Sequence, residues 1–181
     1  MQKIDKTDTL KTILSGRKYT LDYFQREYRW GRKQIEQMIT DFQSTFEEFY
    51  DPDDHDTTEE VMDYGFYYMG CIICTGGSVK KLIDGQQWLT SLTLLLIYLD
   101  NLQKKTITNV DERVSLDNMI YSNAFGKKSF NIDVEDRRAC VQALLQSGET
   151  FTPQNESTKN MLDRYRDIEE LFPDELKGEA L

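Results

Sequence analysis

Apolar residues recur at three- and four-residue steps in several segments of the chain, which is the spacing of amphipathic α-helices. The clearest stripe lies between Lys33 and Tyr50 and consists of Ile35, Met38, Ile39, Phe42, Phe46 and Phe49. The same pattern predicts further helices over residues 9–14, 88–102, 110–121, 133–145 and 157–171. Asp133 can cap the helix that ends at Leu145, because its side-chain oxygen can accept a hydrogen bond from a free N–H group. Most of the chain should therefore be helical.

Shorter stretches between these helices have the composition of β-strands. Residues 67–75 and 79–83 are rich in strand-forming residues, and Gly76-Gly77 between them can adopt the positive φ angle of a tight turn. These two stretches should form a β-hairpin. Residues 18–21 and 129–132 are further short extended segments.

The order of these elements predicts an α+β fold. We expect a small β-sheet with a hairpin, packed by several α-helices, and a helical C-terminal extension. With 181 residues, 39% of them hydrophobic, the chain is long enough for one domain with a substantial core. Residues 1–105 should form the part that carries the motifs, with the apolar helix 88–102 buried against the hairpin. Residues 106–181 should form a mostly helical extension of the same domain.

The charge of the chain limits its partners. The formal net charge is -10 and the pI is near 4.7, whereas nucleic-acid-binding proteins usually present a basic face. We therefore expect contact with DNA only through other regions or another chain. The acidic stretch from Asp51 to Asp63 does not fit a calcium loop, because the sixth position of an EF-hand loop is glycine and here is Asp56. We assign no metal ligands.

Three cysteines, Cys71, Cys74 and Cys140, form an odd and sparse set that does not suit a small disulfide-rich secreted domain. In an extended stretch Cys71 and Cys74 would point to opposite faces, so we interpret them as small buried residues rather than as a metal or redox pair. The most apolar run, Leu92 to Leu99, is far shorter than the ~20 residues of a membrane-spanning helix. The expected location is the cytoplasm, without membrane contact.

The most informative segment runs from Asp84 to Ser91, where a strand pattern changes into a helix pattern. Backbone N–H groups and the helix dipole favour an anion such as phosphate at the start of a helix. Gly85 allows the backbone to approach a ligand closely, and the side chains of Gln86 and Gln87 offer amide donors and acceptors. The carboxylate of Asp84 could serve a ribose hydroxyl, a metal-bound water or an arginine. The alternative is an ordinary turn with solvated glutamines.

A second segment upstream, Tyr23 to Trp30, supplies the positive charge that the turn lacks. Arg26 and Arg29 carry planar guanidinium groups suited to bidentate phosphate or carboxylate contacts, and Gln25 can orient them or a ligand. The aromatic residues of this segment could stack on a base, although such residues more often pack in a core. An ion pair between Arg26 and Asp84 would use the same residues without any ligand.

These segments resemble those of a known family. Phe24-Gln25-Arg26-Glu27-Tyr28-Arg29-Trp30 matches the Tyr-Gln-Arg-x-Tyr-x-Trp segment of the N-terminal domain of GmrSD-type modification-dependent restriction enzymes. Asp84–Ser91 matches the family's Asp-Gly-Gln-Gln-Arg-Leu-Thr-Thr segment, with Trp88 and Ser91 as the two differences. The resemblance covers most of the chain. It implies a ParB/sulfiredoxin-like core, in which the loop equivalent to Asp84–Trp88 holds nucleotide phosphates with Mg²⁺.

The resemblance also implies a role in restriction and phage defence, with a nucleoside triphosphate and Mg²⁺ as cofactors. The implied catalytic residues are Asp84, Gln86 and Gln87, and the implied nucleotide-binding residues are Gln25, Arg26, Asp84, Gly85, Gln86, Gln87 and Thr90. The expected partners are a nuclease domain or subunit of the full system and further copies of this chain.

Two departures from the family bear on activity. Trp88 replaces the arginine best placed to stabilise charge on a transferring phosphoryl group, so we expect hydrolysis to be weak or absent. The only histidine is His55, whereas the HNH-type nuclease domains of full-length relatives need histidines, so we expect no nuclease centre here and a fragment or subunit of a larger system. Two functions remain open: a nucleotide-binding regulatory domain, or a non-catalytic protein-interaction module with a degenerate phosphate site.

Overall fold

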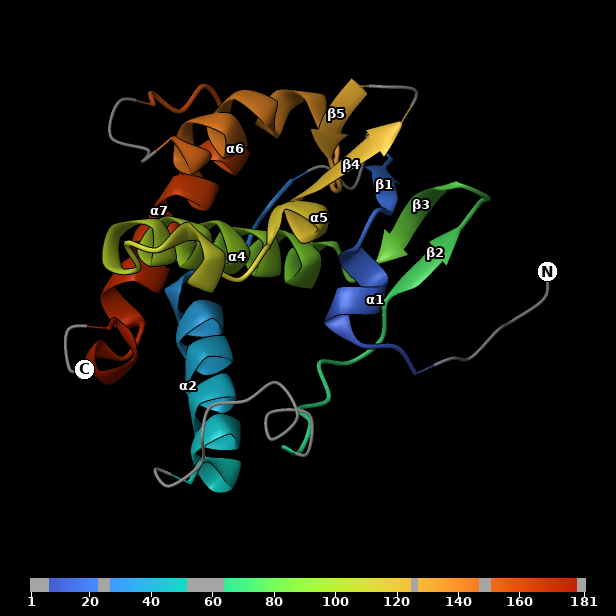
Figure 1. Ribbon diagram of the computed structural model, residues 1–181. Helices are drawn as coiled ribbons and strands as arrows, with labels where there is room; N and C mark the ends of the chain where they lie inside the picture. Colours follow the sequence, from blue (N-terminus) through green and yellow to red (C-terminus); the bar gives the residue numbers. More distant parts are fainter. Residues whose placement is uncertain (1–6, 23–26, 52–63, 125–126, 147–150, 179–181) are drawn as a thin grey trace.

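The computed structural model describes residues 7–22, 27–51, 64–124, 127–146 and 151–178. In chain order, the elements are α1 (Leu10–Leu14), β1 (Lys18–Leu21), α2 (Arg32–Phe49), β2 (Ile73–Thr75), β3 (Val79–Asp84), α4 (Gln86–Thr106), the 3₁₀ turn η2 (Val110–Glu112), α5 (Asp117–Ile120), β4 (Tyr121–Ala124), β5 (Lys127–Phe130), η3 (Glu135–Arg137), α6 (Arg138–Leu145), α7 (Glu156–Leu171) and η4 (Asp174–Leu176). The strands lie toward one side of the molecule, and α2, α6 and α7 lie toward the other (Figure 1). The predicted α+β class is confirmed.

The larger sheet has the strand order β1-β3-β2. β1 and β3 run parallel, with α2 lying between them in the sequence, and β2 and β3 form the predicted antiparallel hairpin. Gly76 in the hairpin turn has φ 101°, which is the conformation that glycine adopts at little cost. The smaller sheet pairs β4 with β5 and adjoins β1 through a bridge between Tyr19 and Ile132. The extended segment predicted at 129–132 thus begins two residues earlier, at Lys127.

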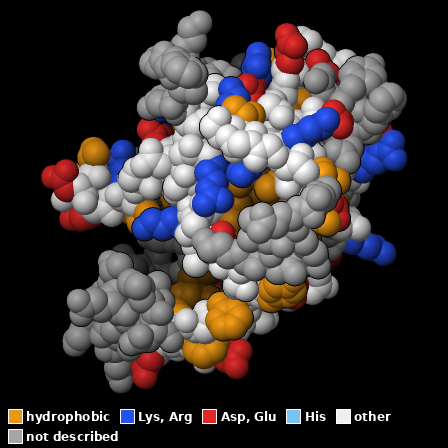
Figure 2. Space-filling model, turned by 90° about the vertical axis from the view of Figure 1, so that its right-hand side faces the viewer, with side chains coloured by type: hydrophobic (Ala, Val, Ile, Leu, Met, Phe, Trp, Pro, Cys, Tyr) orange, Lys and Arg blue, Asp and Glu red, His pale blue; other side chains and the backbone are white. Residues whose placement is uncertain are grey.

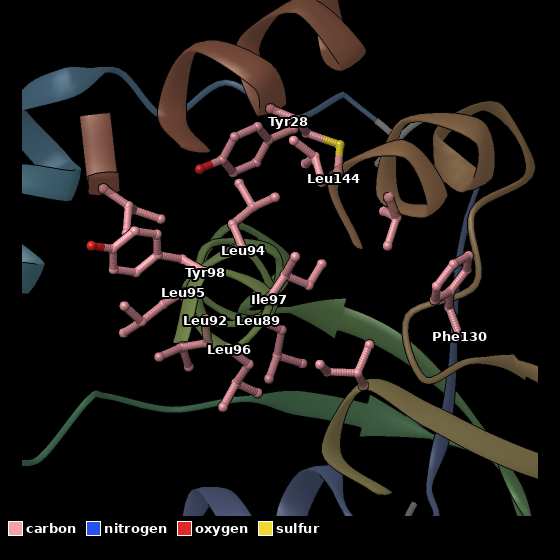
Figure 3. Packing of buried hydrophobic residues seen from close by; sticks show 14 of the residues in the cluster. Tyr28, Leu89, Leu92, Leu94, Leu95, Leu96, Ile97, Tyr98, Phe130 and Leu144 are labelled. Atoms are coloured by element: carbon pink, nitrogen blue, oxygen red, sulfur yellow. The ribbon is translucent and has the colours of Figure 1, made fainter. Parts of the chain in front are cut away.

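Helix α4 is buried on all sides rather than along one stripe. Every residue from Leu89 to Tyr98 is buried, and Figure 3 shows the leucines of α4 radiating into the core. α5, α6 and α7 pack against α4, so the helices of the second half of the chain supply most of its cover. The predicted apolar helix is confirmed, but it begins at Gln86 and continues to Thr106. Among the described residues, none of the helices combines the length and the apolar character needed to cross a membrane.

The helix predicted over residues 110–121 is wrong. This stretch forms a single 3₁₀ turn, a one-turn helix and the start of β4. The cause is the end of α4: the Gln103 carboxamide accepts from the N–H of Val114 at 3.0 Å and donates to its carbonyl at 2.9 Å. The Arg113 guanidinium also donates to the carbonyl of Ile107 at 2.7 and 2.9 Å. Gln103 thus engages the N–H and the carbonyl of Val114, two backbone groups that a helix over residues 110–121 would need.

The strand predicted over residues 67–75 is shorter than expected, since only Ile73–Thr75 is paired. Gly70 has φ 92°, which interrupts the extended backbone, and β2 lies at the edge of the sheet. Cys71 and Cys74 are therefore exposed, and their interpretation as buried residues is wrong. Cys140 is buried in the core. The three are free thiols.

Asp133 does not cap a helix as predicted, but joins β1 to α6. Its carboxylate lies 2.7 Å from Lys18 Nζ and 2.6 Å from Arg138 Nε, and α6 begins only at Arg138. Burial alone would raise the pKa of Asp133, yet hydrogen bonds from Arg138 and Lys18 outweigh it and lower the pKa. The helix predicted at 157–171 is confirmed as α7, with Asn155 Oδ1 accepting from the N–H of Thr158 at 2.8 Å.

The burial of α4 generates a stability prediction. Ile97 is completely buried, so Ile97→Ala should lower the free energy of unfolding by about 2–5 kcal/mol, as is typical when a large core side chain is truncated. Val114 is 67% exposed, and Val114→Ala should change it by less than about 0.5 kcal/mol. Urea denaturation measures both values. Equal losses in the two variants would contradict the central position of α4.

Candidate functional site

The turn between β3 and α4 depends on a glycine in the left-handed region of backbone conformation. Asp84 ends β3, Gly85 adopts φ 89° and ψ 6°, and α4 starts at Gln86. A side chain at position 85 would also come within 3.0 Å of Ile72 Cγ1 and 3.3 Å of its Cα. The N–H of Gly85 donates to Asp84 Oδ1 at 2.7 Å, and the Asp84 side chain is exposed. The predicted strand–turn–helix junction is thus confirmed.

The N-cap residue of α4 makes no side-chain hydrogen bond to the first N–H groups of the helix, and this end is called the open N-terminus below. Gly85 stands at the N-cap position and has no side chain to accept from the first N–H groups of the helix. The first turn contains no acidic residue that would compensate the positive end of the helix dipole. This end of α4 therefore retains the electrostatic preference for an anion on which the phosphate prediction depends.

The two glutamines of the turn hold the upstream motif in place. Gln87 Nε2 donates to the carbonyl of Glu27 at 3.0 Å, and Gln87 Oε1 accepts from the N–H of Arg29 at 3.0 Å. Gln86 Nε2 donates to the same Glu27 carbonyl at 3.3 Å, while Gln86 Oε1 is buried without a hydrogen-bond partner. The structure therefore brings residues 27–30 of the upstream motif beside the turn, through backbone groups of these residues and the side-chain amides of the two glutamines.

Residues 27–30, called the 27–30 segment below, are held on the other side by α7. The N–H of Tyr28 donates to Ser157 Oγ at 3.1 Å, and Asn160 Nδ2 donates to the Tyr28 carbonyl at 3.0 Å. Arg164 Nη1 donates to the Trp30 carbonyl at 3.1 Å. The segment thus lies between the start of α4 and the first turns of α7, with side chains from both helices bonding its backbone.

Side chains of the 27–30 segment alternate between the core and solvent. Tyr28 is completely buried, and its hydroxyl forms a 2.7 Å hydrogen bond with Ser91 Oγ. Burial raises the pKa of Tyr28 to about 12, although the bond to Ser91 and the charges of Arg164 and Arg137 act against the shift. Glu27 and Arg29 are exposed and form an ion pair with each other. In the described part of this motif, the most exposed side chains are those of Glu27 and Arg29.

Trp88 packs against Trp30. The two indoles meet edge to face with ring centroids 4.8 Å apart, and both are partly buried. At 3.6 residues per turn, a position two residues from Gln86 and from Thr90 lies on nearly the opposite side of the helix. The indole that replaces the family's arginine therefore faces Trp30, away from the side of α4 that carries Gln86 and Thr90.

Thr90 lies inside the protein rather than on the open face of the turn. It is buried, and its hydroxyl donates to the Gln86 carbonyl at 2.7 Å. The same oxygen accepts from Arg137 Nη1 at 3.1 Å. Arg137 is 3% exposed, so a cation lies beneath the first turn of α4. Sequence reasoning did not single it out for the site.

A signal for Arg137 was present in the sequence. Val134, Cys140, Val141 and Leu144 stand at three- and four-residue steps from Arg137 or from one another, and all four are buried. An arginine within such a stripe occupies a core position, and arginines are rarely buried without a specific partner. Tyr28, by contrast, was identified within its motif but interpreted as a base-stacking or packing residue rather than as a partner of Ser91.

Two of the predicted nucleotide-binding residues, Gln25 and Arg26, lie outside the described residues, as do Tyr23 and Phe24. The upstream motif is described from Glu27 onward. Among the described residues, no group of three or more His, Cys, Asp or Glu side chains could hold a metal ion. Two cavities of the described surface, of about 190 and 310 Å³, are lined by residues outside both motifs.

Comparison with protein families identifies the class of this domain. The model of the GmrSD restriction endonuclease N-terminal domain matches residues 10–179. The chain therefore belongs to the family of GmrSD restriction endonuclease N-terminal domains, and the predicted family is confirmed. No curated protein matches the chain.

The Gln87 contacts generate a prediction about local stability. Gln87→Ala removes two hydrogen bonds to the 27–30 segment and should lower the free energy of unfolding by about 1–2 kcal/mol. The amide of Arg29 loses its acceptor, and one such bond is worth about 0.5–1.5 kcal/mol, so hydrogen exchange there should be about two- to tenfold faster.

Gln43→Ala is the matched control, because Gln43 bonds only the Glu47 side chain among the contacts in α2 that the structure describes. It should leave exchange at Arg29 unchanged. If the Arg29 amide exchanges at the wild-type rate in Gln87→Ala, the carboxamide does not hold the segment.

Proposed function

We propose that this chain is a nucleotide-binding regulatory domain of a restriction system, which binds phosphates at the junction of β3 and α4. The observation that carries the proposal is the open N-terminus of α4, a buried 21-residue helix that follows a left-handed glycine without an acidic first turn. Membership of a restriction endonuclease family supports the biological setting. Defence against phage DNA is the role that such a setting implies.

In this proposal each motif residue has a defined task. The backbone N–H groups at the start of α4 contact phosphate oxygens, and Gly85 lets the ligand approach the backbone. Gln86 and Gln87 keep the 27–30 segment beside the turn through their contacts with Glu27. Gln25 and Arg26, which precede that segment in the sequence, would supply further polar and positive groups.

Asp84 fits a supporting role toward Mg²⁺. Its carboxylate is exposed at the end of β3, beside the open helix start, and a single carboxylate can help hold Mg²⁺ when phosphate oxygens and waters complete the octahedron. The ion would neutralise charge on the phosphates, while Asp84 would orient it.

Turnover by this site should be slow. The family's arginine at position 88 is a tryptophan here, and its indole packs against Trp30. Removing a cation that stabilises a transferring phosphoryl group typically costs orders of magnitude in rate. We therefore propose binding with weak or no hydrolysis, and regulation of a nuclease part elsewhere in the full restriction system.

A non-catalytic interaction module is the second candidate, and the exposed apolar side chains favour it. Phe66 is 90% exposed and Tyr68 is 67% exposed, and Ile73, Val79 and Ile83 of the hairpin also reach solvent. Figure 2 shows hydrophobic and basic side chains exposed next to each other on this side of the molecule. Large exposed apolar surfaces often mark protein contacts.

Nucleotide titration tests the first candidate. Each nucleoside triphosphate with Mg²⁺ should be tried, and at about one hundred times Kd a bound ligand should stabilise the fold by about 2.7 kcal/mol, visible as a rise in Tm. Asp84→Asn should weaken binding about tenfold with Mg²⁺, a typical cost of losing a supporting group at a metal site. Without Mg²⁺ the same variant should bind as well as wild type or better, because a repelling carboxylate is gone.

Asp111→Asn is the control for net charge, because Asp111 is exposed in η2 away from both motifs. Asp111→Asn should leave the affinity for the nucleotide unchanged both with and without Mg²⁺. Absence of a thermal shift and of calorimetric heat with all four triphosphates would remove the nucleotide proposal and leave the interaction module.

Restoring the family's arginine provides a separate test of turnover. Trp88→Arg loses the edge-to-face contact with Trp30 and should reduce stability by about 1–2 kcal/mol. Helical side chains tilt toward the N-terminus, so an arginine at position 88 can reach back toward bound phosphates. Phosphate release should then rise above the wild-type rate. A loss of stability without any gain in phosphate release would favour the interaction module.

A further inference from the structure

Arg137 is joined to the first residue of α4 by a short chain of hydrogen bonds. Its Nη1 donates to Thr90 Oγ1 at 3.1 Å, and the Thr90 hydroxyl donates to the Gln86 carbonyl at 2.7 Å. Gln86 and Thr90 are four residues apart, so they lie on the same side of α4 and about 6 Å apart along its axis. The guanidinium therefore lies within about one helical turn of the open end.

Among the described residues, the exposed charges beside the turn oppose a polyphosphate more than they attract it. Asp84 and Glu27 are exposed acids beside the start of α4, and the chain as a whole carries a formal charge of -10. The helix dipole contributes only about half a positive charge. Arg29 is 76% exposed and paired with Glu27, so water and salt screen its effect.

We propose that Arg137 is a positioning residue of the phosphate site, which holds the first turn of α4 through Thr90 and attracts the phosphates with its buried charge. The inference rests on the proposed function and deepens it. A buried charge acts over a longer range than an exposed one, because the protein interior screens it less than water does. Arg137 thereby takes over the electrostatic role that residue 88 cannot fill.

The charge of Arg137 also affects Tyr28. Its positive charge acts against the rise in the pKa of Tyr28, although the phenol is bonded to Ser91 on a different side of α4 from Thr90. Trp88 faces Trp30 and leaves the Gln86–Thr90 side of α4 to Arg137.

The test compares nucleoside mono-, di- and triphosphates with wild type and Arg137→Gln. If the buried charge attracts phosphates, Arg137→Gln should lose about tenfold in affinity for the triphosphate but less than about threefold for the monophosphate, since the Coulomb term grows with ligand charge. A residue that only supports the fold would weaken all three ligands by the same factor. The ratio of the three dissociation constants, rather than any one of them, is the readout.

Arg138→Gln is the matched control, because it removes the same charge one residue away from a side chain that is 54% exposed and paired with Asp133. It should change each affinity by less than about twofold. Arg137→Lys keeps the charge without the planar fork and should keep the wild-type ratio between triphosphate and monophosphate. If Arg137→Gln does not fold, the ratio of dissociation constants measured with Arg137→Lys serves as the test.

The outcomes separate this inference from the proposed function. Wild-type protein that binds no nucleotide overturns both. Wild-type binding with an unchanged ligand ratio in Arg137→Gln, or a folded Arg137→Lys that loses the ratio, overturns only the role of Arg137. A selective loss of triphosphate binding in Arg137→Gln, with Arg138→Gln and Arg137→Lys close to wild type, supports it.

Discussion

The burial of α4 around its whole circumference, from Leu89 to Tyr98, is the constraint on which the other elements depend. A helix that is apolar around its whole circumference cannot rest on one surface, so α5, α6 and α7 must enclose it. β3 runs directly into this helix through a single glycine, which fixes the sheet against one end of the helical core. The sides of α4 from Leu89 to Tyr98 are occupied by packing, so the less buried residues of this helix lie toward its two ends.

The pairing of the two sequence motifs follows from hydrogen-bonding rules. A carboxamide carries a donor and an acceptor on one planar group, so Gln87 can satisfy a carbonyl and an N–H of a neighbouring chain at once. The 27–30 segment has no strand partner among the described residues, and its backbone groups are satisfied by Gln86, Gln87, Ser157, Asn160 and Arg164 instead. The two glutamines therefore have a structural role that requires no ligand, because they fix the 27–30 segment beside the turn.

Prediction from sequence succeeded where local patterns decide the structure and failed where distant side chains intervene. The helical stripe at 33–50, the Gly76 turn and the strand-to-helix change at Gly85 are local, and all three are confirmed. Residues 110–121 had a helical pattern, but Gln103 and Arg113 engage the backbone there. The contact between Gln87 and Glu27 spans sixty residues, so no local rule could assign it. The ligand contacts of Asp84, Gln86, Gln87 and Thr90 stay predictions.

The alternation within the 27–30 segment divides the motif into two kinds of position. Tyr28 is buried and bonded to Ser91, and Trp30 is partly buried against Trp88, so replacing either side chain would disturb the packing beneath the segment. Glu27 and Arg29 lie in solvent, while only their backbone groups are engaged by the glutamines. Substitutions at these two outward positions can therefore change the charge of the surface while the backbone hydrogen bonds that shape the segment remain in place.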